Sequence, residues 1–198
     1  MKLQKSLTSL TKWARHFTLV VIAVMSLSAM PARAEDPIRI GAVKSVTGPA
    51  SYIGEAQKNA LELMVEQVNQ EGGVLGRPLE LVLYDDATNP ERARTMMQRL
   101  LTQDRVSVVI GGSLTPTTLA METLASRHGV PMISQAGSRV VVSPIRKWLF
   151  VNPESEEMVA NKTFAHMVKK GISKVALLSS SAGFGRAARQ TYSELAAE

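Results

Sequence analysis

The stretch from Val106 to Leu119 carries the residue types best suited to holding a small anion. Residues 106–110 favour a buried strand, and Gly111-Gly112 interrupts it. Thr115-Pro116 then predicts a helix start, with Thr115 as the N-cap and proline at the first helical position. Such a turn offers free backbone N–H groups and a hydroxyl to an anion, although Pro116 contributes no N–H. The stretch therefore predicts either a ligand site or a packed crossover without one.

A second place for chemistry is the acidic pair Asp85-Asp86, which follows a predicted strand. Two carboxylates can bind a metal or act as acid and base. They can also be a structural strand end before Asn89-Pro90, which has the form of a helix start. Because no third ligand stands at metal-site spacing, we favour the structural interpretation. His128 and His166 are isolated and are interpreted as helix-end or surface residues.

The sequence contains no catalytic motif that we can identify. It has no phosphate-binding loop, no G-x-S-x-G, no H-E-x-x-H and no cysteine, which excludes thiol catalysis and disulfides. Tyr52, Phe184 and Tyr192 are too scattered to form a surface on which bases could stack. We therefore expect a protein that is not an enzyme, uses no cofactor, holds no metal and binds no nucleic acid.

The elements that must position these residues alternate between strand and helix. Strands are predicted at 38–43, 79–84, 106–110, 130–134 and 174–178, with β-rich or extended stretches at 139–143 and 150–153. Helices are predicted at 54–69, from 90 to about 101, at 115–128, at 154–170 and from 186 onward, and residues 44–53 are predicted to be a loop. Repeated βα units with short loops indicate an α/β fold with a parallel sheet and helices on both faces.

The basic character of the chain belongs to its first 34 residues. The 198 residues include 23 Lys and Arg and 17 Asp and Glu, a net charge of +6. Five of the basic residues precede residue 35, where no acidic residue occurs, so 18 basic residues remain against 17 acidic ones. The excess positive charge therefore gives no reason to expect a nucleic-acid partner.

These 34 residues have the three parts of a secretory signal peptide. A basic start is followed by an apolar run over 17–30 and by the small-residue pattern Ala32-Arg33-Ala34. The run is shorter than the roughly 20 residues that a membrane span needs. We expect cleavage after Ala34 and an exported, periplasmic protein without stable membrane insertion.

Several motifs, in this order, resemble one known family. They are Ile38-Arg39-Ile40-Gly41, Thr47-Gly48-Pro49, the run 69–78 (NQEGGVLGRP), Tyr84-Asp85-Asp86 and the run 129–134 (GVPMIS). Together they are similar to the periplasmic branched-chain amino-acid-binding proteins, the type I substrate-binding proteins of ABC importers. The likeness extends from about residue 38 to the end of the chain.

The resemblance implies two α/β lobes that close on a ligand. It implies an N-terminal lobe at 35–152, complete up to the first crossover, and the beginning of a second lobe at 153–198. Thr115 matches the position that holds the α-carboxylate of the ligand, and Ser138 matches a second hydroxyl position. Ala136 matches the residue whose carbonyl accepts from the α-ammonium group.

Two positions expected at the ligand depart from the branched-chain binders. Phe184 stands where they have a tyrosine from the second lobe, and Ile53 stands where they have an aromatic residue, for which Tyr52 is the neighbouring substitute. The solute class therefore stays open among aliphatic and aromatic amino acids, amides, urea and aromatic acids.

The family is about twice this length, so the resemblance implies a C-terminally truncated chain with weak or no ligand binding and an exposed apolar edge. The expected function is capture of an amino acid or a related small molecule for the membrane permease of an ABC importer. An alternative is the ligand-sensing domain of a receptor or amide-type regulator with the same fold. A third is a hydrolase that uses Asp85 and Asp86.

Overall fold

The computed structural model describes residues 36–197, so the predicted signal peptide at 1–34 lies outside the described residues. Five parallel strands form one sheet in the order β2-β1-β3-β4-β5. The strands are β1 (Ile38–Lys44), β2 (Leu79–Asp85), β3 (Val108–Gly111), β4 (Met132–Ser134) and β5 (Leu149–Val151). This is the predicted α/β fold with a parallel sheet.

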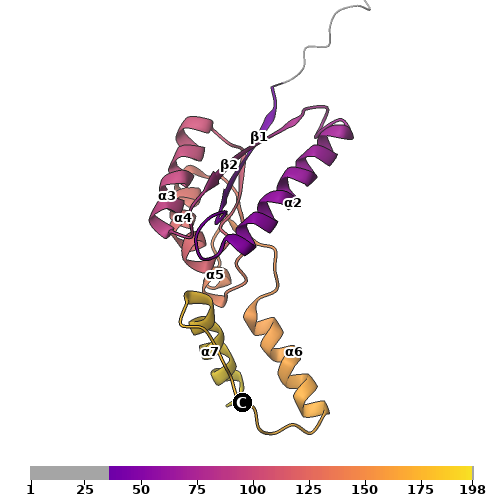
Figure 1. Cartoon of the computed structure of the whole chain (residues 1–198), viewed down its shortest axis with the longest axis vertical. Coiled ribbons are helices and arrows are strands. Elements are labelled where there is room, and N and C mark those ends of the chain that lie inside the picture. Colours follow the sequence, from indigo (N-terminus) through magenta and orange to yellow (C-terminus); the bar gives the residue numbers. More distant parts are fainter. Residues whose placement is uncertain (1–35, 198) are drawn as a thin grey trace, which may run out of the picture. The chain divides into compact units, whose positions relative to one another are not determined.

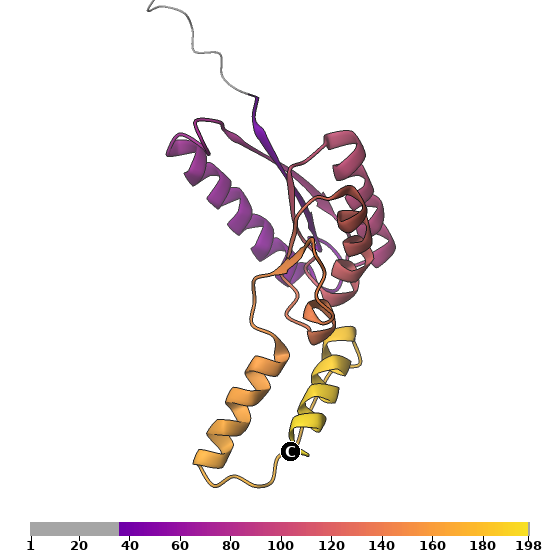
Figure 2. The same cartoon turned by 180° about the vertical axis from the view of Figure 1, so that it is seen from behind.

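Helices cover both faces of the sheet, as the βα repeats predict. α2 (Ser51–Gln70) lies on one face, and α3 (Pro90–Arg99) and α4 (Thr115–His128) lie on the other (Figures 1 and 2). A π-helical turn, η1 (Leu100–Asp104), continues α3. The remaining helices are α5 (Arg139–Val142), α6 (Glu156–Lys169) and α7 (Gly183–Leu195), of which α6 and α7 lie side by side.

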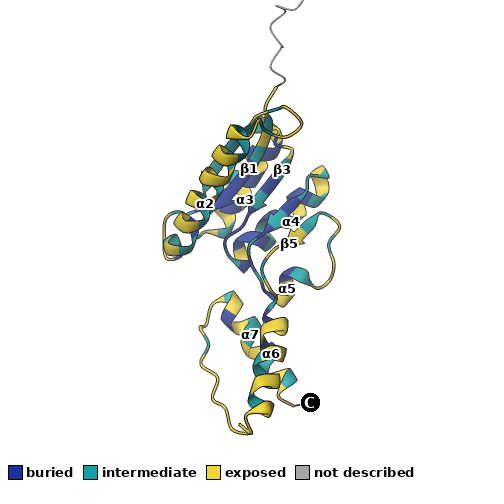
Figure 3. Cartoon of the chain, turned by 90° about the vertical axis from the view of Figure 1, so that its right-hand side faces the viewer, coloured by how far each residue is buried: buried dark blue, intermediate teal, exposed yellow. Residues whose placement is uncertain are grey.

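The core lies between the sheet and the α3–α4 face. Val43 of β1 and Val109 of β3 are fully buried there, as are Met97 of α3 and Met121 of α4. The predicted stripe of α3 and its extension includes Met97 and Leu100, both fully buried, so the methionines are packing residues. Figure 3 shows this burial in dark blue, whereas α6 and α7 are mostly exposed or half-buried.

Local signals explain where several helices begin and end. The side chain of Asn89 accepts a hydrogen bond of 3.0 Å from the N–H of Arg92, which caps α3 as predicted. α4 ends at His128, and the next residue, Gly129, has a φ of +66°, the left-handed conformation that glycine adopts without strain. α2 begins at Ser51, three residues before the predicted start, so the loop prediction for 51–53 is wrong.

The structure corrects three further predictions. Thr115 is the first helical residue rather than the N-cap of α4, and Leu114 takes the N-cap position. Residues 139–142 form the short helix α5 instead of a β-rich stretch. Residues 174–178 belong to no strand, because no strand pairs with them within the described part of the chain.

Candidate functional site

Loops from neighbouring strands meet at the carboxyl edge of the sheet, where open α/β sheets bind ligands. The Ser113 hydroxyl accepts from the N–H of Ser45 at 3.1 Å and donates to Oε1 of Gln57 at 2.6 Å. The loop after β3 is thereby tied to the loop after β1 and to α2. The arrangement fixes the backbone at this edge.

A second network ties the loop after β4 to α4 and β3. The hydroxyls of Thr118 and Ser134 lie 2.8 Å apart, and the N–H of Ala136 donates to Ser134 Oγ at 3.0 Å. The N–H of Gln135 donates to the carbonyl of Gly112 at 3.4 Å. Ala136, predicted to present its carbonyl to a ligand, is therefore held next to the β3–α4 turn.

Thr115, predicted to hold the α-carboxylate, and Ser138, predicted as the second hydroxyl position, both have buried hydroxyls that form no hydrogen bond within residues 36–197. Thr115 is 5% exposed and Ser138 is fully buried. Thr117, rather than Thr115, takes the hydrogen bond at the start of α4, from the N–H of Leu114 at 3.2 Å. Buried hydroxyls without partners are uncommon in folded proteins, and the Ser45 hydroxyl is another one among the described residues.

Thr115 lines a pocket of about 700 Å³ between α4 and α7. Pro116 and Leu119 of α4 and Val140 of α5 form apolar parts of its wall. The α7 residues that line it are Gly183, Arg186, Ala187, Arg189, Gln190 and Ser193. The pocket thus combines the start of α4 with a polar and basic face of α7.

The two aromatic residues predicted for the site are both exposed. Tyr52 stands in the first turn of α2 and is 75% exposed. Phe184 is 51% exposed and is adjacent to Gly183, which lines the pocket. Ligand contact by Tyr52 and Phe184 stays a prediction.

Glu156 is a polar group that the sequence analysis missed. It is 3% exposed, and neither carboxylate oxygen has a hydrogen-bond partner in the part of the chain that the structure describes. Its N–H donates to the carbonyl of Gly137 at 3.0 Å, so it lies against the loop between Ala136 and Ser138. An acidic residue after Ser155 indicates only the start of a helix, and the burial of its side chain depends on the tertiary structure.

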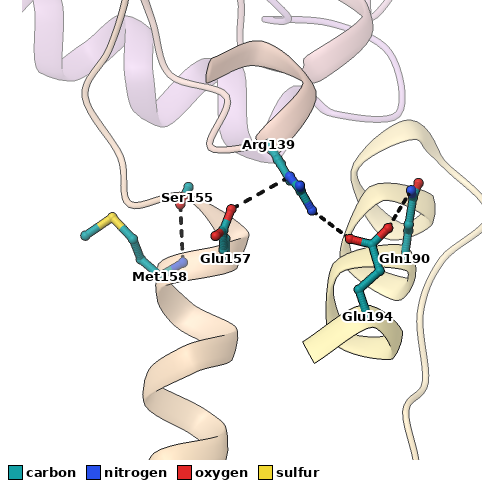
Figure 4. Close-up of polar contacts among 6 residues, drawn as sticks. All are labelled: Arg139, Ser155, Glu157, Met158, Gln190 and Glu194. Atoms are coloured by element: carbon teal, nitrogen blue, oxygen red, sulfur yellow. Dashed lines mark hydrogen bonds and ion pairs between the residues drawn. The ribbon is translucent and has the colours of Figure 1, made fainter. Parts of the chain in front are cut away.

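Glu156 and its neighbours also line a smaller cavity of about 230 Å³ among α5, α6 and α7. Arg139 of α5 lies at this cavity and bridges the two longer helices (Figure 4). Its guanidinium donates to Glu194 of α7 at 2.7 Å and lies 3.7 Å from Glu157 of α6. The residue that follows Ser138 therefore connects the β4 loop to both helices.

Lys44, at the end of β1, is a second buried charged residue that the sequence did not reveal. It is fully buried, and its ammonium group donates to Oε1 of Gln135. Burial lowers the pKa of Lys44 to about 7, against the opposing charge of Asp86. Burial also raises the pKa of Asp86, although the Ser45 hydroxyl and the N–H of Thr88 oppose that rise.

The contacts of Asp85 and Asp86 are those of a structural turn. Asp85 accepts from the hydroxyl of Thr47 at 2.5 Å and from the N–H of Ala87 at 2.9 Å. Burial raises the pKa of Asp85, but these hydrogen bonds outweigh it and leave the pKa below its ordinary value. Asp86 accepts from the N–H of Thr88 at 2.8 Å. No cluster of three metal-ligating side chains occurs within residues 36–197.

Known proteins resemble this chain in sequence. The leucine-, isoleucine-, valine-, threonine- and alanine-binding protein of Pseudomonas aeruginosa is 32% identical over 125 residues, which are 63% of this chain and 32% of that protein. The Leu/Ile/Val-binding protein of Escherichia coli K12 is 30% identical over 107 residues, which are 54% of this chain and 29% of that protein. This chain thus spans about a third of the length of these curated relatives.

Solved structures share the fold. A solute-binding protein of an ABC transporter from Rhodopseudomonas palustris BisB5, in complex with 3,4-dihydroxybenzoic acid, has a TM-score of 0.73 and 27% identity. The match covers 82% of this chain and 44% of that one. A branched-chain amino acid transporter substrate-binding protein from Streptococcus pneumoniae, in complex with isoleucine, shows the same fold at a TM-score of 0.71 and 24% identity, covering 80% and 46%.

The match to a protein family covers most of the chain. A family model described as periplasmic binding protein matches residues 37–198, which include every described strand and helix of the chain. No helix among the described residues is long and apolar enough to cross a membrane. The resemblance drawn from the sequence motifs is confirmed: the chain belongs to the periplasmic binding protein family, with relatives that bind branched-chain amino acids.

Proposed function

We propose that this protein is the solute-binding component of an ABC importer and captures an amino acid or a related small molecule at the carboxyl edge of its sheet. In this proposal the chain is exported by residues 1–34 and acts in the periplasm. Residues 35–152 form the N-terminal lobe, and residues 153–198 begin the second. Its partner is a membrane permease, and the protein performs no catalysis.

The observation that carries the proposal is a group of buried polar side chains without partners. The hydroxyls of Thr115 and Ser138 can donate to a carboxylate, while the carboxylate of Glu156 can accept from an ammonium group. A buried polar group without a partner costs about 1–3 kcal/mol, and more if it is charged. A zwitterionic solute would supply the complementary groups, so binding would relieve that cost.

The start of α4 supports the carboxylate end of this arrangement. Free N–H groups and the helix dipole favour an anion at the helix N-terminus, next to Thr115. Glu156 stands at the start of α6 and its backbone is bonded to the loop that carries Ser138. Both ends of a small zwitterion would thus meet groups of the appropriate type.

Calorimetric titration of the purified protein with amino acids, amides and aromatic acids tests the proposal. The resemblance to longer proteins predicts weak or no ligand binding by this chain, whereas the buried groups without partners favour binding. We expect one compound class to bind measurably, and Thr115→Val and Glu156→Gln each to weaken that binding by about tenfold or more, because Thr115→Val loses a hydrogen bond to a charged group and Glu156→Gln loses the negative charge that faces an ammonium group.

Two variants serve as matched controls for these substitutions. Thr102→Val removes an exposed threonine hydroxyl, and Glu91→Gln removes an acid from the first turn of α3. Both should bind as the parent does. Absence of binding by every compound, or equal loss in the controls, would reject the proposal.

A sensing role is the second candidate function. A solved structure with the same fold and 26% identity is described as an extracellular ligand-binding receptor from Rhodopseudomonas palustris. This description supports a receptor role as the alternative. Uptake of the bound solute by cells, lost when this protein is removed, would favour transport. Unchanged uptake with an altered transcriptional or motile response would favour sensing.

A further inference from the structure

The pocket between α4 and α7 differs from the rest of the candidate site in its charge. Two arginines, Arg186 and Arg189, are among its lining residues, and none of the lining residues is acidic. We infer that the solute carries a carboxylate in addition to its α-carboxylate, and that Arg186 and Arg189 bind this second acidic group. The inference rests on the proposed function and names the solute class as dicarboxylic amino acids.

The two arginines of this pocket form no ion pair with an acidic residue of the described chain. Arg186 is exposed and donates one hydrogen bond, from Nη1 to the carbonyl of Ser181 at 2.5 Å, and no ion pair joins it to an acidic residue of the described chain. Arg189 has no hydrogen bond or ion pair with any residue of the described chain. A guanidinium presents several donors in a planar fork that matches a carboxylate.

The same pocket is lined by a buried hydroxyl that could donate to an acid. Thr115 is 5% exposed, lines the pocket, and its hydroxyl has no partner within residues 36–197. It stands at the first turn of α4, where the helix dipole adds further positive potential. Side chains from α4 and α7 thus favour anionic groups on both sides of one pocket.

The nearby acidic residues do not pair with these arginines. Glu194 lies in the neighbouring cavity and is paired with Arg139 at 2.7 Å. Glu156 also lines that cavity, where the proposed function assigns it to an ammonium group. A solute with one ammonium group and two carboxylates would use Glu156, Thr115 and the arginines together.

Apolar lining residues explain why the solute would be an acid with a carbon chain. Pro116, Leu119, Val140 and Ala187 share the wall with the two arginines. Methylene groups between two carboxylates can pack on this surface without leaving a polar group unpaired. A small inorganic anion would not use that part of the wall.

The test compares three solutes by calorimetry on the purified protein: L-glutamate, its neutral amide L-glutamine, and L-leucine. We expect glutamate to bind at least tenfold more tightly than glutamine or leucine, and this preference to shrink as salt is raised from about 0.05 to 0.5 M. Arg189→Gln and Arg186→Gln should weaken glutamate binding about tenfold and change glutamine binding little.

Arg94→Gln is the matched control, because it removes an exposed arginine from α3, away from the pocket. It should leave the preference intact. Tight binding of leucine or glutamine with no loss in the α7 variants would overturn this inference and leave the proposed function standing. If none of the three, nor any other amino acid, amide or aromatic acid, binds, both the inference and the proposed function are wrong.

Discussion

At the residue scale, the buried polar side chains at the carboxyl edge of the sheet differ in whether they have hydrogen-bond partners. Thr115, Ser138 and Glu156 have no internal partners among the described residues, whereas Ser113 and Thr118 are fully engaged in holding the loops together. Some hydroxyls therefore hold the loops together, and those of Thr115 and Ser138 form no hydrogen bond within the described chain. Such a division is typical of a preorganised binding site.

The buried ammonium group of Lys44 makes the stability of the fold depend on pH. Its pKa is about 7 in the folded protein and near 10.5 when unfolded, so the unfolded chain holds more protons between those pH values. Stability should therefore rise with pH from 7 toward 10, by at most about 1.4 kcal/mol per pH unit. Below pH 7 the penalty for burying the charged lysine is fully present.

Urea unfolding at several pH values checks this expectation. Lys44→Met should reduce the slope of stability against pH, because it removes the buried titrating group. Lys162→Met, which removes an exposed lysine from α6, is the control for losing a lysine. Parallel curves for the parent and Lys44→Met would contradict the assignment.

At the element scale, close packing between α2 and the end of β1 fixes the edge of the sheet. A Cβ atom at Gly54 would lie 2.0 Å from the carbonyl oxygen of Ser45, and backbone atoms cannot move aside easily. Only a residue without a side chain lets the helix pass this close to the loop. Gly54 therefore allows α2 to hold Gln57 against Ser113.

Gly54→Ala should accordingly destabilise the protein, by about 1–3 kcal/mol from overpacking. A loss of stability would be informative, because in a helix interior without a clash, replacing glycine by alanine stabilises the helix by about 1 kcal/mol. Chemical denaturation measures the change. Asn59→Ala, at an exposed position of the same helix, should be nearly neutral or slightly stabilising. Equal behaviour of the two variants would mean that the contact is not tight.

Comparison of sequence and structure shows which elements could be predicted. The strands and helices up to α4 followed from apolar patterning in the sequence, helped by local signals such as the Asn89 cap of α3 and the left-handed Gly129 after α4. Residues 139–142 have a β-branched composition, yet they lie between a loop and Pro144 and form one helical turn. Strand formation at 174–178 needs a pairing partner, which local sequence does not supply.

Only the part of the candidate site that follows from the order of strands and loops could be predicted from the sequence. Thr115 and Ser138 follow strands directly, so the topology places them at the carboxyl edge. Lys44 and Glu156 carry charged side chains, which are rarely buried, and only tertiary packing reveals that they are. The pocket-lining arginines of α7 depend on how that helix meets α4, which residue spacing does not specify.

At the scale of the whole described structure, Arg139 connects the sheet-bearing part to the α6–α7 pair. Its guanidinium lies between Glu157 of α6 and Glu194 of α7, and Gln190 also donates to Glu194 at 2.9 Å (Figure 4). The Gln190 hydrogen bond, followed by the one from Arg139, lowers the pKa of Glu194. The position of α7 at the pocket is thus linked to the loop of Ser138.

Replacement of Arg139 tests this connection. Arg139→Gln should raise the pKa of Glu194 part of the way to its ordinary value, because Gln190 still donates to it. NMR titration of the Glu194 carboxyl measures the shift, and high salt should move the parent in the same direction. Arg127→Gln, at the far end of α4, should leave the titration unchanged. An unaltered curve for Arg139→Gln would show that the two residues do not interact in solution.

The connection between α6 and α7 is expected to be a site of proteolytic cleavage. Residues 172–180 belong to no helix or strand, and Leu178 is 99% exposed. A protease that cleaves this connection would leave Thr115 on one fragment and Arg186 with Arg189 on the other. Nicking would thereby divide the recognition surface while both fragments still carry intact helices. A bound solute that contacts both fragments would hold them together after the cut, so co-elution of the nicked pieces would report occupancy without any label.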